Sequence, residues 1–489
     1  MLEISEKEVI ERLHFDNPWW EEKTGIISTY QDYPKRDYFD PFYTLVTTRK
    51  VNRAVILMGP RRVGKTIMLY HAIQKLLDEG VSRYAILYLS LETPIYTGLS
   101  LEKIVLLFRN TFEHKRDSKL YIFFDEIQYL RDWEIHLKSL VDSYSSYKFI
   151  GTGSAAAALR LKSQESGAGR FTDFMLPPLT FAEYLRFINR ESELITEVTD
   201  EDGDFFSQNI EVLNEEFINY LNYGGYPEAV FSELLRSNSA RYIKSDIIDK
   251  VLLRDLPSLY GISDIQDLNR LFTTLAYNTG NEVSLEGLSK SSGVAKNTLR
   301  RYLEYLEAAF LIKRIYRIDQ NAKRFQRAVT FKVYLTNPSM RGALFGYVDQ
   351  DSEFMGALTE TAIYSQWFHA DDVIANLHYS RWSDGEVDMV FLEEPKYEPA
   401  WIVEVKWSDR YIDQSSELKS LFSFLDKSVK ETKKINVTVT TKTKRESKLV
   451  NNRQVNFIPS SELAYMLGRN LMKYKGMRLS ARLPGEESS

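Results

Sequence analysis

The stretch AVILMGPRRVGKT, residues 54–66, decides the fold of the region around it. Its first five residues form an apolar run typical of a buried strand, and the other eight fit the pattern G-x-x-x-x-G-K-[ST] of a phosphate-binding loop. The apolar periodicity of Ile67–Leu77 predicts the helix that must follow such a loop. Because strand, loop and helix signals occur together, the sequence predicts a nucleoside triphosphate site rather than a chance glycine-rich turn.

The residue types of the loop explain how it would hold phosphate. Glycines permit a tight turn that aims backbone N–H groups at phosphate oxygens. Lys65 is expected to reach the β- and γ-phosphates, and the Thr66 hydroxyl is expected to bind Mg2+. The residues predicted to bind ATP are Gly59, Pro60, Arg61, Arg62, Val63, Gly64, Lys65 and Thr66, with Asp125 from a later strand.

Length and composition set the class of protein. A chain of 489 residues exceeds what one hydrophobic core supports, so several domains are expected. The net charge of −5 argues neither for nor against nucleic acid, and the absence of cysteine excludes disulfides, cysteine-ligated zinc and a cysteine nucleophile. No apolar run approaches the ~18 residues of a membrane span, and the first residues are unlike a signal peptide. We therefore expect a cytoplasmic protein without membrane contact.

Residues 51–190 alternate between apolar runs and amphipathic segments. This alternation predicts an α/β fold in which helices cover both faces of a parallel sheet. Strands are predicted at 54–58, 84–89, 120–125, 148–151 and 174–176, and helices at 101–112 and 133–144.

The third predicted strand ends in two carboxylates, Asp125 and Glu126. Its carboxyl end is expected beside the phosphate loop, because parallel α/β sheets bind ligands at that edge. Asp125 then suits the Mg2+ of the nucleotide, and Glu126 suits a general base for the attacking water.

The extra strand at 84–89, between the phosphate loop and the two carboxylates, resembles that of the AAA+ and related additional-strand ATPases. The resemblance implies roles for two further residues. Ser154, at the end of Gly-Thr-Gly-Ser, matches the sensor position that contacts the γ-phosphate or orients the water; a plain turn residue is the alternative. Arg170 matches an arginine finger that acts within its own chain or on a neighbouring subunit, which would imply a homo-oligomer; a surface ion pair is the alternative.

Helical patterns replace the strands after Pro177-Pro178 and continue to about residue 257. We interpret 191–257 as the helical lid that AAA-type ATPases place over the nucleotide. In their order, all these motifs, with Pro-Leu-Thr-Phe-Ala-Glu-Tyr-Leu at 178–185 and Gly-Gly-Tyr-Pro at 224–227, resemble a large family of bacterial and archaeal ATPases. In that family an AAA-type domain is fused to a C-terminal domain of unknown function. The resemblance covers nearly the whole chain and is specific for ATP binding rather than for a biological role.

Residues 258–336 carry the pattern of a winged helix. A short helix, a glycine-containing turn at 292–294 and an amphipathic helix over 295–310 follow one another. The segments 311–318 and 328–335 could then pair as the wing. The side chains expected to contact DNA are Lys296, Asn297, Arg300, Arg301, Lys313, Arg314, Arg317, Lys323, Arg324 and Arg327. A module that only connects domains or binds protein is the alternative.

Two alternating segments in the C-terminal part, 385–391 and 401–406, predict the strands of a hairpin. Glu404 and Lys406 are two residues apart and therefore project from the same face. Asp388 is expected beside them on the partner strand. Two carboxylates can hold a divalent metal, and a neighbouring lysine can activate water or stabilise the transition state of phosphate hydrolysis.

Together with Glu360 on a predicted helix, these residues resemble the catalytic set of PD-(D/E)XK nucleases, which have a restriction-endonuclease-like α/β fold. The resemblance implies that Asp388 and Glu404 bind Mg2+ and that Lys406 and Glu360 serve catalysis. Val387 stands where the proline of the motif's name would be. The alternative is a fold kept for binding, in which the residues form a buried ion-pair cluster.

A basic tract follows this candidate site. Its spacing suits a strand and loop beside bound DNA, and a solvated face is the alternative. Its members are Lys427, Lys430, Lys433, Lys434, Lys442, Lys444, Arg445 and Lys448.

The sequence therefore predicts five parts, which are an N-terminal arm (1–50), an AAA-type P-loop ATPase domain (51–190), a helical lid (191–257), a winged-helix domain (258–336) and a nuclease-like domain (337–489). The favoured hypothesis is an ATP-hydrolysing enzyme that grips duplex or branched DNA and cuts it with Mg2+. The second is an ATP-driven switch whose C-terminal domain binds nucleic acid or protein without cleaving. A small-molecule kinase is disfavoured, because it would not need the last two parts.

Overall fold

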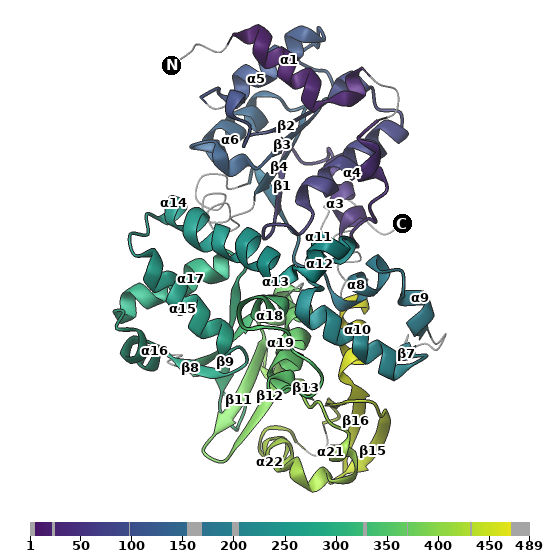
Figure 1. Cartoon of the computed structure of the whole chain (residues 1–489), viewed down its shortest axis with the longest axis vertical. Coiled ribbons are helices and arrows are strands. Elements are labelled where there is room, and N and C mark those ends of the chain that lie inside the picture. Colours follow the sequence, from purple (N-terminus) through teal and green to yellow (C-terminus); the bar gives the residue numbers. More distant parts are fainter. Residues whose placement is uncertain are drawn as a thin grey trace. The chain divides into compact units, whose positions relative to one another are not determined.

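The computed structural model describes residues 5–21, 25–96, 98–153, 169–197, 205–325, 330–368, 370–430 and 433–470. The chain forms two compact units, Met1–Pro177 and Pro178–Ser489, which Figure 1 colours along the sequence from purple to yellow. Within the described ranges, no helix is long and apolar enough to cross a membrane.

The first unit contains a five-stranded parallel sheet with the order β2-β3-β4-β1-β5. The strands are β1 Ala54–Met58, β2 Ile86–Ser90, β3 Tyr121–Asp125, β4 Lys148–Gly153 and β5 Phe171–Met175, and the main helices are α4 Lys65–Asp78, α5 Leu101–Thr111 and α6 Trp133–Ser143. Every side chain of β1 is buried, as expected when helices cover both faces. The predicted parallel α/β sheet is confirmed, and β4 separates the strand of the phosphate loop from the strand that ends in Asp125.

The N-terminal arm covers the edge of this sheet at β2. Its helices are α1 Glu6–Asp16, α2 Ser28–Gln31 and α3 Phe39–Thr47, with a 3-10 turn at Pro18–Trp20. The Asn17 side chain donates to the Tyr88 carbonyl oxygen (2.7 Å) and accepts from its N–H (2.6 Å), and Trp20 Nε1 donates to Ile86 O (2.9 Å). These bonds satisfy edge groups that would otherwise lack a partner strand. Trp19 and Trp20 are both buried, so they pack the arm onto this domain.

The second unit is built on a mixed nine-stranded sheet with the order β15-β16-β14-β13-β12-β11-β9-β10-β8. Its strands are β8 Glu282–Ser284, β9 Ile312–Ile318, β10 Thr330–Leu335, β11 Leu377–Trp382, β12 Gly385–Glu393, β13 Glu398–Glu404, β14 Asn436–Thr441, β15 Glu446–Val450 and β16 Arg453–Pro459. The predicted pairing of the two wing segments is confirmed, because β9 and β10 pair antiparallel. The pattern did not predict that β9 also pairs in parallel with β11, which makes the wing and the nuclease-like strands one continuous sheet.

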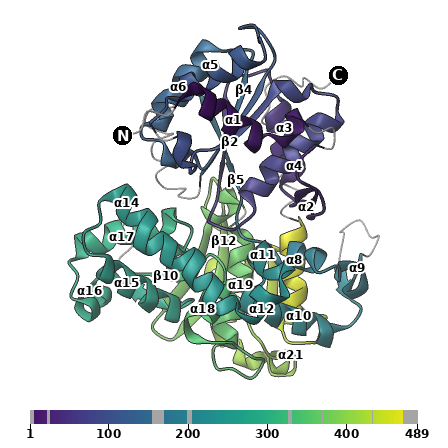
Figure 2. The same cartoon turned by 45° about the horizontal axis from the view of Figure 1, so that its top comes forward.

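The helices of the predicted winged helix are α15 Ile265–Tyr277, α16 Leu285–Ser292 and α17 Lys296–Ala308. Gly293 ends α16 with φ 74°, a backbone conformation that glycine adopts at little cost. Val283 and Ser284, which directly precede α16, belong to β8. Figures 1 and 2 both show α15, α16 and α17 grouped together, and Figure 1 shows β8 beside them.

The segment interpreted as a lid contains α9 Glu191–Leu194, the hairpin β6 Ile195–Glu197 and β7 Phe205–Ser207, α10 Ile210–Tyr223, α11 Pro227–Phe231, α12 Glu233–Ser237, α13 Ser239–Tyr242, two π-helical stretches (Ile243–Asp249 and Val251–Asp255) and α14 Leu256–Tyr260. Phe217 and Leu221 of α10 share a hydrophobic core with Leu358 of α19 (Met355–Trp367) and with Ala464. This core also takes in α8 Phe181–Phe187. The segment thus packs within the second unit, while its role as a lid and the five domain boundaries stay predictions.

The remaining helices of the second unit lie at the ends of these elements or between strands. They are α18 Ser339–Phe345, α20 Asp371–Ile374, α21 Arg410–Asp413 and α22 Lys419–Ser428, with a further helical stretch at 460–470. Leu421 and Leu425 of α22 pack with Val390 of β12 and Ile402 of β13 in a second core. This packing covers one face of the strands that carry the predicted nuclease-like residues.

Candidate functional site

The phosphate loop joins β1 to α4 through left-handed backbone at Arg62 (φ 64°) and Gly64 (φ 93°). Because α4 begins at Lys65, the N–H groups at its N-terminus face the loop, as in other phosphate sites. The Lys65 ammonium donates to the carbonyl oxygens of Gly59 (3.1 Å) and Pro60 (2.7 Å) and is buried. The loop thus combines oriented N–H groups with an enclosed cation, the two features that bind phosphate.

Gly59 opens the loop where no side chain would fit. A Cβ atom at this position would lie 2.2 Å from the carbonyl oxygen of Leu176, which follows β5. The first glycine of the motif is therefore required by the close approach of two backbone segments.

Asp125 links the loop to β3 and β4. Its Oδ2 accepts from the Thr66 hydroxyl (2.8 Å) and the Tyr88 hydroxyl (3.0 Å), and its Oδ1 accepts from the Thr152 hydroxyl. Burial, with the neighbouring charge of Glu126, raises the pKa of Asp125, and these three donors oppose the shift. The Thr66 hydroxyl and the Asp125 carboxylate are oxygen donors of the kind that Mg2+ prefers, so the residues fit the expected cation.

Glu126 sits at the carboxyl edge of the sheet with left-handed backbone (φ 52°). Its N–H donates to the Thr152 hydroxyl (3.0 Å), and its carboxylate accepts from the Gln128 amide. The carboxylate is only half-buried, which leaves it accessible to water, as a general base requires. Ser154, the predicted sensor residue, lies outside the described residues.

Arg170 lies at the amino ends of the parallel strands, opposite the end that carries the phosphate loop. It directly precedes β5, and its carbonyl oxygen accepts from the N–H of Ala54 at the start of β1 (2.9 Å). Five residues of parallel strand, roughly 17 Å, separate these amino ends from the phosphate loop. An arginine finger acting within its own chain therefore does not fit, and action on a neighbouring subunit stays a proposal. The Arg170 side chain bonds Asp142 at the surface (2.5 Å).

Arg36 is a residue of the phosphate site that sequence reasoning missed. It comes from the N-terminal arm, is buried, and donates to the carbonyl oxygens of Val63 in the loop (2.7 Å) and Pro177 (2.9 Å). The guanidinium thus fixes the loop to the segment after β5. No motif marks this arginine, because its partners lie 27 and 141 residues away in the chain.

Replacing Arg36 with alanine is expected to weaken ATP binding roughly tenfold and to lower the free energy of unfolding by about 3 kcal/mol, because two charge-assisted bonds to buried carbonyls are lost. Titration of a fluorescent ATP analogue and thermal unfolding would measure the two effects. Arg49→Ala is the matched control, since Arg49 also donates to two carbonyl oxygens, Ser146 and Leu120, but far from the loop. Equal ATP affinities in the two variants would contradict a role for Arg36 in the site.

The strands β12 and β13 bring three of the predicted nuclease-like residues together. The Lys406 ammonium donates to Glu404 Oε1 (2.6 Å) and lies 3.6 Å from Asp388 Oδ2. The Val405 N–H donates to the same Asp388 oxygen (2.9 Å), and the Asp388 N–H approaches Glu404 Oε2 (3.4 Å). The antiparallel hairpin that the sequence predicted is therefore present, and it places both carboxylates beside the lysine.

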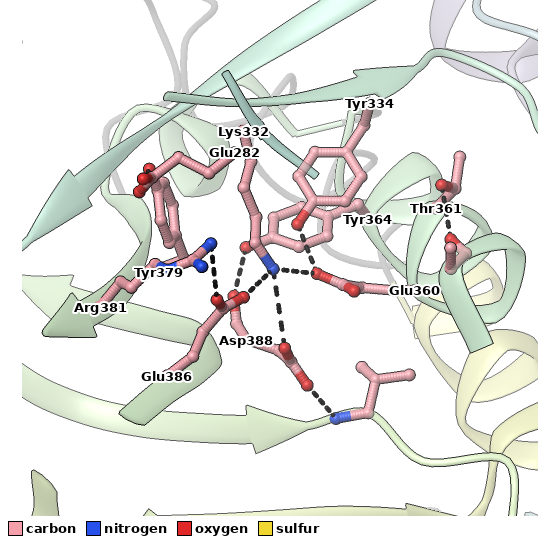
Figure 3. Close-up of polar contacts among 12 residues, drawn as sticks. Glu282, Lys332, Tyr334, Glu360, Thr361, Tyr364, Tyr379, Arg381, Glu386 and Asp388 are labelled. Carbon is pink, nitrogen blue, oxygen red and sulfur yellow. Dashed lines mark hydrogen bonds and ion pairs between the residues drawn. The ribbon is translucent and has the colours of Figure 1, made fainter. Parts of the chain in front are cut away.

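Glu360 reaches the same cluster through a residue that the sequence analysis overlooked. Lys332 of β10 donates to Glu360 Oε1 (2.8 Å), also bonds Glu386, and lies 3.7 Å from Asp388 Oδ1 (Figure 3). The Tyr334 hydroxyl donates to Glu360. A lone lysine within the apolar strand sequence TFKVYL was the signal that could have revealed it, because a charge at such a position needs a buried partner.

The electrostatics of the cluster follow from burial and from these pairs. Burial raises the pKa of Glu360 to about 7, and burial together with the charge of Asp388 raises the pKa of Glu404 to about 7. Burial opposes ionisation of Asp388 as well, but Lys406 and Lys332 hold its pKa below the ordinary value. Asp388 is therefore the carboxylate that stays ionised.

The stability of the protein is expected to fall as pH rises from about 4.5 to about 7. In that window the folded state retains protons on Glu360 and Glu404 that the unfolded chain has lost, so the stabilising contribution is complete at the low end and lost at the high end. The loss should be roughly 1–3 kcal/mol, measured by denaturant unfolding at several pH values without metal. Glu360→Gln should flatten the profile, whereas the exposed Glu393→Gln should leave it unchanged; identical profiles would contradict the assignment.

Asp388 and Glu404 offer oxygen ligands that suit Mg2+, which proteins commonly bind through one or two carboxylates and water. Among the residues that the structure describes, no group of three or more acidic or histidine side chains is arranged to hold a metal. The residues therefore fit a cation held by two carboxylates rather than an all-protein cage.

The second helix of the winged helix, α17, exposes the side chains Lys296, Asn297, Arg300 and Arg301, as expected. Three other predicted DNA contacts are already engaged. Arg314 Nε donates to Glu307 (2.8 Å), Arg317 lies 3.9 Å from Glu282, and Arg324 donates to the Asn376 side chain (2.8 Å). Arg327 lies outside the described residues.

The basic tract is also partly engaged. Lys433 pairs with Glu398 (3.3 Å), Lys448 donates to the Ile412 carbonyl oxygen, and Arg445 donates to Phe205 O (3.1 Å). These three side chains hold neighbouring segments together. The tract is therefore not a uniform, freely exposed surface for nucleic acid.

Comparisons with known proteins identify two regions of the chain. Residues 51–185 match a family described as "AAA domain", and residues 214–351 match a family described as "Domain of unknown function (DUF8612)". An uncharacterized protein of Haemophilus influenzae is 26% identical over 60% of this chain and 69% of its own. The uncharacterized protein MJ1544 of Methanocaldococcus jannaschii is 23% identical over 79% and 81%.

Solved structures give weaker matches. The AMPPCP-bound DnaA of Aquifex aeolicus is 13% identical, with a TM-score of 0.28 over 57% of this chain and 90% of its own. PCH-2 of C. elegans is 14% identical, with a TM-score of 0.29 over 41% and 61%. TM-scores this low do not establish a common overall fold, so what those proteins bind is not carried over to this chain. The family match and the loop geometry together identify residues 51–185 as an AAA-family ATPase domain.

Proposed function

We propose that this protein hydrolyses ATP to control an action on DNA, and that its second unit cuts DNA in a Mg2+-dependent, PD-(D/E)XK-type site. The observation that carries the nuclease part is that Glu360, Asp388, Glu404 and Lys406 converge into one ionic cluster. They come from α19, β12, the end of β13 and the segment that follows β13. Four residues up to 46 positions apart match the order and spacing of the motif and also meet in space.

In the ATPase site, each side chain has a definite task. Lys65 and the first N–H groups of α4 hold the phosphates, and Thr66 with Asp125 would hold Mg2+, which supplies charge neutralisation on the phosphates. Glu126 takes a proton from the attacking water, and Gln128 orients its carboxylate. Arg170 would complete the site of a neighbouring subunit in a homo-oligomer.

In the nuclease-like site, Asp388 and Glu404 would hold Mg2+, which acts as a Lewis acid towards the scissile phosphate. Lys406 stands beside both carboxylates, where its ammonium can stabilise the negative charge that develops on the phosphate. Its pKa is raised by Asp388 and Glu404 against the effect of burial, so it is a cation rather than a base.

The second candidate is an ATP-driven switch that binds nucleic acid or protein without cutting. The observation that favours it is the engagement of both Asp388 oxygens, one by Lys332 and one by Lys406 and the Val405 N–H. In that case the cluster would be a structural ion-pair network.

One experiment separates the two candidates. The full chain is incubated with end-labelled duplex, branched and single-stranded DNA, with Mg2+ and with or without ATP, while phosphate release is followed in parallel. Mg2+-dependent fragments support the nuclease. ATP hydrolysis without fragments from any substrate would replace it with the switch, and failure to hydrolyse ATP would overturn the ATPase part.

DNA binding is expected to depend on α17. Replacing Arg300 and Arg301 with alanine should lower the dependence of log K on log salt by about 1.8, since each lost phosphate contact removes about 0.9. Fluorescence anisotropy with duplex DNA at several salt concentrations measures this slope. Arg270→Ala on α15, which removes an exposed arginine near Asp267, is the control; an unchanged slope in the double variant would exclude α17 as the contact.

A further inference from the structure

Lys332 is the most deeply buried charge in the nuclease-like site. Its side chain is 3% exposed, while those of its partners Glu360, Asp388 and Glu386 are 13%, 13% and 29% exposed. It comes from β10, the second strand of the wing, whereas its partners come from α19 and β12. The lysine thus lies beneath the carboxylates and joins elements that the sequence assigns to different domains.

The ammonium of Lys332 faces one carboxylate for each of its three N–H bonds. Glu360 and Glu386 accept from it, and Asp388 Oδ1 lies 3.7 Å away (Figure 3). These three acidic side chains therefore surround a lysine ammonium rather than an open position for a metal ion. This agrees with the lack, among the described residues, of three acidic groups arranged for a metal.

Asp388 is shared between two cations. Its Oδ1 faces Lys332 and its Oδ2 faces Lys406, at 3.7 and 3.6 Å. A carboxylate that presents one oxygen to each of two cations is the arrangement that two-metal phosphodiesterase sites use for a bridging ligand. Here a fixed ammonium occupies one of those two positions.

The net charge of the cluster also indicates room for a single divalent cation. Four carboxylates, Glu360, Glu386, Asp388 and Glu404, face the ammonium groups of Lys332 and Lys406, which leaves two negative charges when all are ionised. Arg381 contacts Glu386 from the solvent side, where its charge is screened. One divalent cation neutralises this excess, and a second would overcompensate it.

We propose that Lys332 is a positioning residue that takes the place of a second metal ion, so that the site loads one divalent cation, on Asp388 and Glu404. The inference rests on the proposed nuclease-like site but concerns the number of cations it holds, whether or not DNA is cut. Glu360 and Glu386 then serve to hold Lys332 instead of a metal.

The test counts bound Mn2+ on the full chain without nucleotide, by electron paramagnetic resonance of free Mn2+. All proteins carry Asp125→Asn, so that the ATP site contributes no cation. The parent should bind one equivalent, Lys332→Met should bind two, with the first at least tenfold tighter, and Lys332→Arg should bind one. Two equivalents or none in the parent, or a single equivalent with unchanged affinity in Lys332→Met, would overturn the proposal.

Removal of a buried lysine leaves carboxylates unpaired and can prevent folding, so two further variants keep the proposal testable. Glu386→Gln should retain the single equivalent, because Glu386 bonds Lys332, whereas Asp388→Asn should lose it. Loss of Mn2+ in Glu386→Gln would make Glu386 a metal ligand and overturn the assignment. A count of one and then two equivalents without DNA cleavage would keep the role of Lys332 and remove only the nuclease.

Discussion

Lys65→Ala is expected to lower ATP hydrolysis at least ~10²-fold, the loss typical when one preorganised charge facing the transition state is removed. In the structure the Lys65 ammonium is enclosed by the loop and held by the carbonyl oxygens of Gly59 and Pro60. No other lysine belongs to residues 59–66, so no neighbour within the loop can replace it. Phosphate release at saturating ATP and Mg2+ measures the effect.

Lys148→Ala is the matched control. Like Lys65, Lys148 is buried and donates to two carbonyl oxygens, those of Thr48 (3.0 Å) and Arg53 (3.2 Å). Because Lys148 begins β4, it lies at the amino ends of the strands, whereas the phosphate loop lies at their carboxyl ends. The Lys148→Ala variant should have a lower free energy of unfolding, while the rate of ATP hydrolysis by the folded protein should not change. Equal turnover in Lys65→Ala and the parent would end the ATPase assignment.

Asp388→Asn is expected to abolish Mg2+-dependent DNA cleavage, with a loss of roughly 10²–10³-fold or more, and to leave ATP hydrolysis intact. Asp388 is the carboxylate whose pKa is lowered, by Lys406 and Lys332 acting against burial, and the amide would remove its charge at almost constant shape. Fragment formation on labelled DNA and phosphate release are measured on the same samples.

Glu398→Gln serves as the control for this variant. Glu398 is on β13, the strand that also carries Glu404, but it forms a surface pair with Lys433 (3.3 Å). Cleavage should persist in it, because exposed pairs contribute little. Undiminished cleavage by Asp388→Asn would show that the cut is made elsewhere.

Features encoded within short stretches could be predicted from the sequence. The phosphate loop, its strand and its helix follow from residues 54–77, where glycine positions and apolar periodicity act locally. The hairpin of β12 and β13 could be predicted for the same reason, because alternation fixes which side chains share a face.

Features that depend on contacts between distant segments could not be predicted from the sequence. Arg36 looks like an ordinary charge until the fold brings Val63 and Pro177 to it. The strand sequence around Lys332 signals a buried partner, but it does not identify Glu360 as that partner. The pairing of β9 with β11 could not be predicted either, because the alternation within a strand fixes which side chains share a face but does not identify the neighbouring strand. The sequence left open whether Arg170 acts within its own chain or on a neighbouring subunit, because the motif fixes the order of residues but not the end of the strands at which Arg170 lies.

The continuous nine-stranded sheet would hold the winged helix at a fixed distance from the nuclease-like residues. Only two strand spacings, about 10 Å, separate β9 of the wing from β12, which carries Asp388. Hydrogen-bonded strands do not stretch or swing as a linker does. A duplex held by α17 would thus meet the acidic cluster at a constant offset, so the distance between the bound stretch and any cut would be set by the architecture and not by the nucleotide state of the ATPase.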